Sequence, residues 1–581
     1  MKFTQTASAL PWRARHDDAR SATAIAQQHG VSELVAGILT GRKISVDDAP
    51  QFLAPTLRDY LPDPFHLLDM DKAVNRIIKA IEDKHPIAIF GDYDVDGATS
   101  TTLLMQYLGT IGVNITPYIP DRILEGYGPT IPAFKTLIGQ GARLIITVDC
   151  GTLSHEPIQY AYDRNVDVIV LDHHLSSGAL PPAHAIVNPN RVDETSPHRQ
   201  LAAVGVTFLF LVALNQRLRD AGFFVQNPAP NLLAMLDIVA LGTVCDVMPL
   251  TGLNRAFVAQ GLKVMAQRRS LGLSVLSDVS RMDEAPNVYH LGFLLGPRIN
   301  AGGRVGKSGL GVELLTATDE AAARQIAATL DVHNQERQAI EAGVLEHALA
   351  LAEQQNNLPV IMVAGEGWHQ GVIGIVAGRI KERYSRPAIV VAIENDSAKA
   401  SARSVTGVDM GAAIHAAVAE GLIEKGGGHA MAAGFSTDAS KLADLHEFLI
   451  GRMVASVAAY TDARVVQYDG TLSVSGATLE TLDDIARAGP FGIGNPGPRF
   501  VVPNARIAHV AIMKDKHLRV TLADESGTSR LNAIAFNAIG TVLGEWLQAE
   551  KTLHILGELK KNTYQGREST QFMINDVAKA S

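Results

Sequence analysis

Cysteine is almost absent from this chain, with 2 in 581 residues. Cys150 and Cys245 cannot build a disulfide framework, which indicates a reducing compartment. The N-terminal residues lack the apolar stretch that a signal peptide needs. The longest uncharged apolar run, residues 201–215, is shorter than the roughly 20 residues of a membrane span and predicts a buried helix. We therefore expect a soluble, cytoplasmic protein.

Excess positive charge is also missing. The chain has 51 Lys and Arg against 60 Asp and Glu, for a net charge of -9. Overall charge therefore gives no support to binding of a polyanion. Any phosphate-rich ligand must be held by local arginines or by metal ions. The length of 581 residues is too great for one core and predicts about three or four domains.

The pattern of apolar residues divides the chain. Residues 1–85 predict a helical segment interrupted by prolines at 50, 55, 62 and 64. From residue 86, short β-branched runs alternate with helical stretches near 129–140 and 154–164, which predicts βαβ units and a buried parallel sheet. A helix-rich region follows and ends in one long helix over 319–355.

Two further regions follow the long helix. A second alternating α/β region runs from about 358 to 458. Residues 467–578 contain several short strands joined by turns, which is typical of a small barrel or sandwich. The sequence shows neither an internal repeat nor a low-complexity tract.

Polar side chains gather where three successive predicted strands end. Asp92, Asp94 and Asp96 follow the first strand, Asp149 ends another, and "LDHH" (171–174) ends a third. Ligands of parallel sheets bind at the carboxyl ends of the strands. One solvated loop aspartate would be ordinary, but three strands ending this way indicate a site.

Closely spaced carboxylates are tolerable when a divalent cation neutralises them. Aspartates with imidazoles suit Mn²⁺, and Mg²⁺ is possible, whereas zinc more often takes cysteine or further histidine. Two ions about 3.5–4 Å apart can activate a water and steady the leaving oxygen of a phosphoryl displacement. The competing interpretation is a set of solvated turn aspartates.

These residues also carry a family resemblance. "DYDVDG" (92–97), Asp149 and "LDHH" resemble successive motifs of the DHH phosphoesterase superfamily, and "DIVALGTVCDVMPL" (237–250) resembles its fourth motif. "GGGHAMAAG" (426–434) resembles the signature of the DHH-associated second domain. Four more motifs resemble the bacterial single-strand-specific exonucleases of that superfamily: "RINAGGR" (298–304), "GWHQGVIGIVAGRI" (367–380), "SARS" (401–404) and "PFGIGNPGPRF" (490–500). The set occurs in the expected order over about residues 85–570.

The resemblance implies a metal site and its ligands. The implied ligands are Asp94, Asp96, Asp149, His173 and Asp237. Smaller family members begin the first motif with a histidine where this chain has Phe90, so one ligand comes from elsewhere; Asp92 is the candidate, as a further ligand or a base. His174 is expected to act on the substrate phosphate, by stabilising transition-state charge or protonating the leaving group.

The fourth motif offers two aspartates, Asp237 and Asp246. Nine positions along a helix advance by about 900°, which places the two on opposite faces. Only one can point into the cluster if the helix is continuous. Asp237 is the expected ligand, and Asp246 is expected to orient another group or cap the helix.

Arginines in the family motifs are expected to grip the substrate, because a guanidinium fork suits phosphate oxygens. The candidates for substrate binding are Arg122, Arg298, Asn300, Arg304, Ser401, Arg403 and His429. By resemblance, the last three hold a 5′-terminal phosphate. The C-terminal strands are expected to form an OB-type barrel that binds single strands. Its presumed loops carry Lys514, Lys516, Lys560, Lys561, Tyr564 and Arg567, which could also be ordinary surface residues.

The expected fold class is α/β. We expect an N-terminal helical segment (1–85), a DHH-type parallel-sheet catalytic domain (86–318), a long connecting helix (319–355), a smaller α/β DHH-associated domain (356–460) and an OB-type barrel (461–581). The implied function is a 5′→3′ exonuclease on single-stranded DNA, releasing 5′-mononucleotides with two Mn²⁺ or Mg²⁺ ions in recombination and repair. Single-strand-binding protein and a helicase are the implied partners of a monomeric enzyme without membrane contact.

Alternative functions share part of this pattern. A phosphodiesterase acting on oligoribonucleotides or cyclic dinucleotides, or a pyrophosphatase, would use the same cluster but would not need the region after residue 467. A single-strand-binding accessory protein would not need the intact cluster. Both observations favour the exonuclease.

Overall fold

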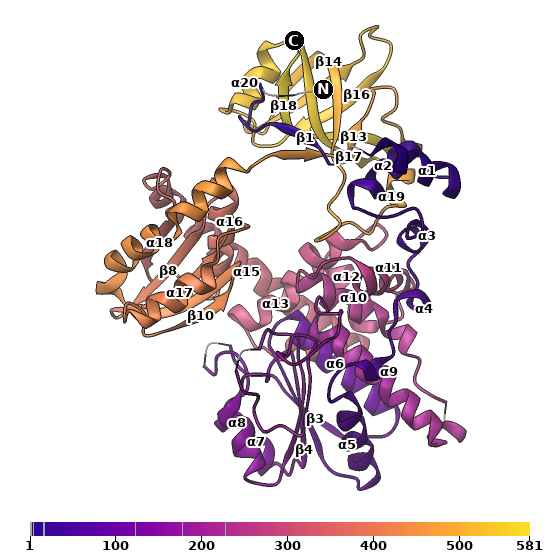
Figure 1. Ribbon diagram of the computed structural model, residues 1–581, viewed down its shortest axis with the longest axis vertical. Helices are drawn as coiled ribbons and strands as arrows, with labels where there is room; N and C mark the ends of the chain where they lie inside the picture. The colour runs from indigo at the N-terminus through magenta and orange to yellow at the C-terminus, as the bar shows by residue number, and fades with distance from the viewer. Residues whose placement is uncertain are drawn as a thin grey trace.

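The computed structural model describes residues 3, 5–15, 18–122, 124–176, 178–226 and 228–580. The outer ends of the first and last expected domains, residues 1, 2 and 581, lie outside the described residues. Two α/β units and a β-barrel are arranged in a ring (Figure 1). The first unit lies at the bottom, the second at the left and the barrel at the top. No helix in the described ranges has the length and apolar character needed to cross a membrane.

The first unit is built on a five-stranded sheet in the order β3-β2-β4-β5-β6, with every pairing parallel. Its strands are β2 (Ile87–Gly91), β3 (Ile115–Tyr118), β4 (Leu144–Val148), β5 (Asp167–Leu171) and β6 (Ala185–Val187). The central strands β2 and β4 are buried along their whole length, as expected for a parallel sheet covered on both faces. The sequence prediction of βαβ units is confirmed.

Helices cover both faces of this sheet. One face packs against α5 (Met70–Glu82), α6 (Val95–Thr110) and α9 (Ala203–Asp220). The other packs against α7 (Ile131–Gly139) and α8 (His155–Tyr162). The apolar run at 201–215 therefore lies in a buried helix, α9. Phe90 points into the second face, with its ring centroid 5.5 Å from that of Tyr118.

A helical layer connects the first unit to the second. Its helices are α10 (Leu236–Cys245), α11 (Gly252–Met265), α12 (Leu271–Val279), the π-helix η4 (His290–Leu295), α13 (Gly296–Val305) and α14 (Leu310–Leu315). The long helix α15 (Glu320–Glu353) begins with an Asp319 cap that accepts from the backbone N–H of Ala322 at 2.8 Å. It packs on α12, α13 and α14 at one end and on α16 (Ile373–Tyr384) at the other. The expected long helix is confirmed.

The second unit contains a mixed sheet in the order β10-β11-β9-β8-β7. The strands are β7 (Ile361–Glu366), β8 (Ala388–Glu394), β9 (Ser397–Arg403), β10 (Lys425–His429) and β11 (Ala432–Asp438). One face packs against α16 (Ile373–Tyr384) and the end of α15. The other packs against α17 (Met410–Ala419) and α18 (Leu442–Asp462).

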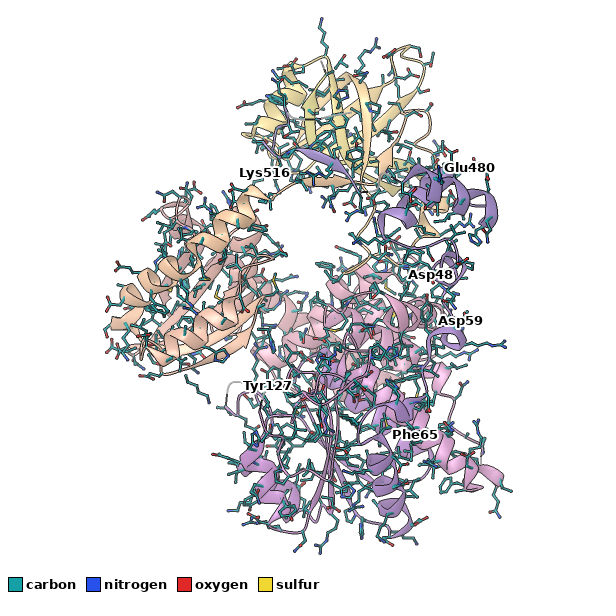
Figure 2. The ribbon with its side chains drawn as sticks, in the orientation of Figure 1. Asp48, Asp59, Phe65, Tyr127, Glu480 and Lys516 are labelled. Atoms are coloured by element: carbon teal, nitrogen blue, oxygen red, sulfur yellow. The ribbon has the colours of Figure 1, made fainter. Side chains whose placement is uncertain are left out.

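The C-terminal region forms a closed barrel. Strands pair in the order β14-β15-β16-β18-β17, and β17 pairs back to β14. The elements are β13 (Gly470–Thr471), α19 (Leu479–Ala486), β14 (Phe500–Met513), β15 (His517–Ala523), β16 (Arg530–Ala535), α20 (Val542–Ala549), β17 (Thr552–Tyr564) and β18 (Arg567–Lys579). Closure removes exposed strand edges. Lys516, labelled in Figure 2, lies at the turn between β14 and β15.

The N-terminal segment is divided between the barrel and the first unit. Strand β1 (Trp12–Ala14) pairs in parallel with β12 (Val466–Tyr468). Helices α1 (Ala19–His29), α2 (Glu33–Gly41) and α3 (Ala49–Leu53) share a core with the barrel, whereas α4 (Leu57–Tyr60), the short turn η1 (Pro64–His66) and α5 pack on the first unit. The chain thus descends from the barrel to the first unit through α3 and α4 (Figure 1).

Candidate metal centre and phosphate cavity

Carboxylates and imidazoles converge at the carboxyl ends of β2, β4 and β5. Three overlapping groups have ligand atoms within 4.8 Å of one another: Asp92, Asp94 and Asp149; Asp96, His173 and Asp246; Asp149, His173 and His174. The His173 Nε2 lies 3.3 Å from Asp149 Oδ1 and 3.5 Å from Asp246 Oδ2, so His173 connects the groups. Parallel strands bring the aspartates of the first motif, Asp149 and the two histidines together because the strand ends share one edge, whereas Asp246 comes from the end of α10.

Local backbone geometry fixes the aspartates of the first motif. Asp94 caps α6, where its Oδ1 accepts from the backbone N–H of Asp96 at 2.9 Å and of Gly97 at 3.1 Å. Asp96 accepts in turn from the first amides of α9, those of Ala203 at 2.6 Å and Val204 at 2.9 Å. A helix N-terminus stabilises negative charge through its free N–H groups. The buried helix α9 therefore holds one wall of the cluster.

Asp149 has an uncommon backbone conformation. Its φ of 61° lies in the left-handed region, which residues other than glycine rarely adopt. Its N–H donates to Leu171 O at 3.0 Å, which fixes the strand end beside β5. Backbone strain of this kind occurs at functional sites, where the surrounding structure holds it.

Neighbouring groups hold the two histidines of "LDHH". Asp172 accepts from the His174 Nδ1 at 2.7 Å and from the His173 N–H at 2.7 Å. Burial would lower the pKa of His174, but the hydrogen bond to Asp172 and the charges of the nearby carboxylates together outweigh burial and raise that pKa above its usual value. Burial lowers the pKa of His173 to about 4, so this imidazole is neutral and free to ligate.

The cluster carries more negative charge than its surroundings neutralise. Burial and then the neighbouring carboxylates raise the pKa of Asp92, Asp149 and Asp246 well above the usual range, and that of Asp96 to about 7. Asp92 Oδ1 and Asp246 Oδ2 are buried without a hydrogen-bond partner among the described residues. Unpaired carboxylate oxygens beside a neutral imidazole fit a hard or borderline divalent cation.

The expectation that Asp237 points into the cluster is wrong. Asp237 is buried at the start of α10, where it accepts hydrogen bonds from Ser270 Oγ and from the Ile238 N–H. It lines a separate cavity of about 250 Å³. Asp246 caps the other end of α10 and faces His173. The two aspartates do lie on opposite faces of the helix, but it is Asp246, and not Asp237, that faces the cluster.

A second feature adjoins the cluster: a cavity of about 1160 Å³ between the first and second α/β units. Among the described residues that line it, five are cationic and none is acidic; the cationic ones are Arg122, Arg304, Lys399, Arg403 and Lys425. Tyr127 lines the cavity and its hydroxyl lies 3.2 Å from His174 Nδ1, so the cavity meets the cluster there. Local positive charge thus supplies what the net charge lacks.

The predicted binding residues divide between this cavity and other places. Arg122, Arg304, Ser401 and Arg403 line it, and Arg403 Nη1 donates to Ser401 Oγ at 3.2 Å. Asn300 lines an adjoining cavity of about 590 Å³ that shares Arg304. Arg298 lies apart, because its guanidinium pairs with Asp331 of α15 at 2.9 Å and bonds Leu294 O.

Sequence reasoning missed Tyr127 and undervalued Asp172 and Asp246. The Tyr127 hydroxyl donates to Asp149 O at 3.0 Å and lies 3.2 Å from His174 Nδ1. Figure 2 labels Tyr127 at the side of the first unit that faces the second. Asp172 stands in the "LDHH" motif, so the sequence itself pointed to it. Tyr127, in the loop before α7, gave no pattern that distinguished it from a surface residue.

Three family models match the chain. The DHH family N-terminal domain matches residues 86–243, the DHHA1 domain matches 357–455 and the RecJ OB domain matches 468–576. Solved structures agree. The chain resembles the RecJ of Thermus thermophilus in complex with Mn²⁺ with a TM-score of 0.79 and 28% identity, covering 98% of this chain and 80% of that one. For the Mg²⁺ complex of the same protein, the TM-score is 0.77 and the identity is 26%, covering 98% of this chain and 78% of that one.

Curated relatives cover nearly the whole chain. The single-stranded-DNA-specific exonuclease RecJ of Dickeya dadantii is 39% identical over 87% of this chain and 90% of its own. The Escherichia coli protein of the same name is 37% identical, over 88% of this chain and 90% of its own. The three matched domains follow one another in the order that the fold displays. The chain therefore belongs to the RecJ family.

Proposed function

We propose that the protein is a metal-dependent exonuclease specific for single-stranded DNA that removes 5′-mononucleotides in the 5′→3′ direction. One observation carries the proposal: a buried carboxylate–imidazole cluster opens onto a cavity lined by five cationic residues and, among the described residues, no acidic one. A cluster of this composition suits phosphodiester hydrolysis. The cationic cavity suits a terminal phosphate.

The proposed ligands form two sets. One set is Asp92, Asp94 and Asp149, and the other is Asp96, His173 and Asp246. Divalent ions bound there, Mn²⁺ or Mg²⁺, would activate a water molecule and stabilise the leaving oxygen. Asp149 Oδ1 and His173 Nε2 are 3.3 Å apart and connect the sets.

The remaining residues position the substrate. Arg403, Ser401 and Arg122 hold the 5′-terminal phosphate in the cavity, which Arg304 also lines. His174, whose Nδ1 is held by Asp172, presents its other nitrogen to the leaving O3′ and supplies a proton. Holding the end in one unit and cleaving in the other gives a fixed 5′→3′ polarity.

The division of labour follows the architecture. The catalytic domain (86–318) cleaves the strand, and the DHH-associated domain (356–460) holds its 5′ end. The long helix (319–355) sets the distance between these two domains. The barrel (461–581) binds the part of the strand that follows. We also propose that the enzyme acts as a monomer in the cytoplasm, where its free cysteines suit a reducing compartment, in recombination and repair. Single-strand-binding protein and a helicase would supply its substrate.

The test is digestion of single-stranded DNA labelled at the 5′ or the 3′ end, with Mn²⁺ or Mg²⁺. The proposal predicts that the 5′ label leaves first, as a mononucleotide, and that duplex DNA survives. Cleavage of dinucleotides or short RNAs while long DNA survives would instead favour a small-substrate phosphodiesterase.

A further inference from the structure

The floor of the cationic cavity is a regular array set by strand register. Strands β10, β11 and β9 lie side by side, and partner residues in register form rows across them. From the cluster outward the rows are His429, Ala432 and Arg403; Gly427, Gly434 and Ser401; Lys425, Ser436 and Lys399. Alternate residues of a strand share a face, so the three rows share the face toward the cavity.

The first row adjoins the metal cluster and the third lies farthest from it. Row one contains His429, whose ring lies 6.5 Å from that of His174. At about 3.3 Å per residue, each row lies about 7 Å from the next. In the middle row, Gly427 and Gly434 present backbone alone, so the floor between Arg403 and the lysines is flat and open.

The third row has cations that a single phosphate does not use. A terminal phosphate at Arg403 and Ser401 occupies the first two rows. Lys399 donates to the neutral Gln370 Oε1 at 3.0 Å, and neither Lys399 nor Lys425 forms an ion pair with any described residue. Both ammonium groups line the same cavity as Arg403.

We propose that this third row is a subsite for the second and third phosphates of a 5′-polyphosphate end. The enzyme then accepts single strands that begin with a 5′-triphosphate as well as a 5′-monophosphate. This inference rests on the proposed function and names a further substrate class for the same site. The lysine side chains of the third row are long and flexible, so their ammonium groups can reach the second and third phosphates of a chain that begins at Ser401 and runs along the floor.

The surroundings limit the ligand to a short polyphosphate. Beyond Gln370 and Lys399 lies a neighbouring cavity of about 780 Å³, which shares these two residues. Its lining includes Glu366, Glu394 and Asp396. A strand continuing in the 5′ direction would carry its phosphates into these carboxylates and be repelled. A chain of three phosphates ends at the lysines.

The reaction at such an end uses the same cleavage step. Water attacks the phosphorus of the first internucleotide linkage, and the bond from that phosphorus to O3′ of the terminal nucleotide breaks. The O3′ takes a proton. The products are a nucleoside 5′-triphosphate and a strand shortened by one nucleotide with a new 5′-monophosphate, which the enzyme then degrades as before.

The experiment compares three DNA strands of one sequence that carry a 5′-hydroxyl, a 5′-monophosphate or a 5′-triphosphate, with Mn²⁺ present. Ion-exchange chromatography identifies the first product, and kcat/KM is measured for each strand. The triphosphate strand is expected to release a nucleoside triphosphate first, with kcat/KM at least equal to that of the monophosphate strand. The hydroxyl strand, without an end phosphate, is expected to have the highest KM.

Variants test the lysines themselves. In the double variant Lys399→Gln/Lys425→Gln, the ratio of kcat/KM for triphosphate over monophosphate strands should fall about fivefold or more, as expected for two lost ionic contacts. Lys381→Gln, on α16 and outside the cavity lining, is the matched control and should leave the ratio unchanged.

Three outcomes are decisive against one claim or the other. If the monophosphate strand is degraded and the triphosphate strand is not, the subsite inference is overturned and the proposed function stands. An unchanged ratio in the double variant also overturns the inference, because the lysines then hold no phosphate. If no strand is degraded with Mn²⁺ present, the proposed function itself fails.

Discussion

Asp246 Oδ2 lies 3.5 Å from His173 Nε2, at the junction of the fourth motif and the "LDHH" strand end. This carboxylate oxygen is buried and has no hydrogen-bond partner among the described residues. An uncompensated carboxylate beside a neutral imidazole is a costly arrangement in a folded protein unless a cation completes it. The pairing therefore defines one half of the proposed metal centre.

The two aspartates of the fourth motif give a matched pair of variants. Asp246→Asn should lower kcat/KM on single-stranded DNA by about 100-fold or more, since even a residue that only supports a ligand contributes about 10–100-fold. Asp237→Asn should keep activity within about tenfold and lower the free energy of unfolding by about 1–3 kcal/mol, because it disturbs a buried hydrogen bond to Ser270. Steady-state kinetics and denaturant unfolding measure both. The reverse pattern would restore Asp237 as the ligand.

A second pair tests which arginines hold the substrate. Arg403→Gln should raise KM for 5′-phosphorylated strands about tenfold, because a charge-assisted contact is lost, and should affect 5′-hydroxyl strands much less. Arg298→Gln should leave this preference unchanged, because Arg298 pairs with Asp331 of α15. Competition between the two strand types measures the preference. Equal effects of both variants would argue against the cavity as the end-binding site.

The sequence predicted the carboxylate wall but not all of its members. Asp92, Asp94, Asp149 and His173 follow parallel strands, whose ends must meet, so their proximity follows from the fold class. Asp246 ends a helix, and which face of a helix turns inward depends on packing against α9 and α11. That information is absent from the spacing of Asp237 and Asp246.

Long-range packing explains the other differences. The local residue pattern of segment 1–85 predicts helices. It cannot predict strand β1, because this strand pairs with β12, more than 450 residues further along the chain. Likewise Arg298 stands in a motif among substrate-binding candidates, and only the path of α15 shows its partner. The α/β units, the long helix and the C-terminal strands were predicted correctly because periodicity and turn residues encode them locally. The choice of a barrel over a sandwich came from the family resemblance.

Metal binding should stabilise the fold. Mn²⁺ at about 100 times its Kd should add about 2.7 kcal/mol to the free energy of unfolding, since the ions bind only the folded cluster. Thermal denaturation with and without Mn²⁺, after treatment with a chelator, measures the shift in Tm. Asp246→Asn should reduce the shift, and Asp237→Asn should preserve it. A wild-type Tm indifferent to Mn²⁺ would contradict the metal centre.

A buried arginine should couple the barrel to the catalytic unit. Arg255 of α11 is fully buried, stacks 3.7 Å over the Phe52 ring, and donates to the carbonyls of Phe52, Ala488, Gly489 and Pro490. Arg255→Met leaves those carbonyls without this donor and should lower the free energy of unfolding by at least about 2 kcal/mol. Limited proteolysis should then cut near residues 488–496 more rapidly.

The same variant has a functional consequence. Loosening the barrel should raise KM for long strands more than for strands too short to reach it. Arg268→Met is the control, because Arg268 forms an exposed ion pair with Asp278. A uniform loss on long and short strands would indicate a general folding defect and would count against the positioning role.

The most direct measurement is a time course with a single-stranded DNA labelled at either end, comparing the wild type with Asp246→Asn in Mn²⁺. The account predicts early release of the 5′ label as a mononucleotide, late loss of the 3′ label, and an inert variant. Release of the 3′ label first, or a variant as active as the wild type, would contradict a 5′→3′ exonuclease built on this cluster.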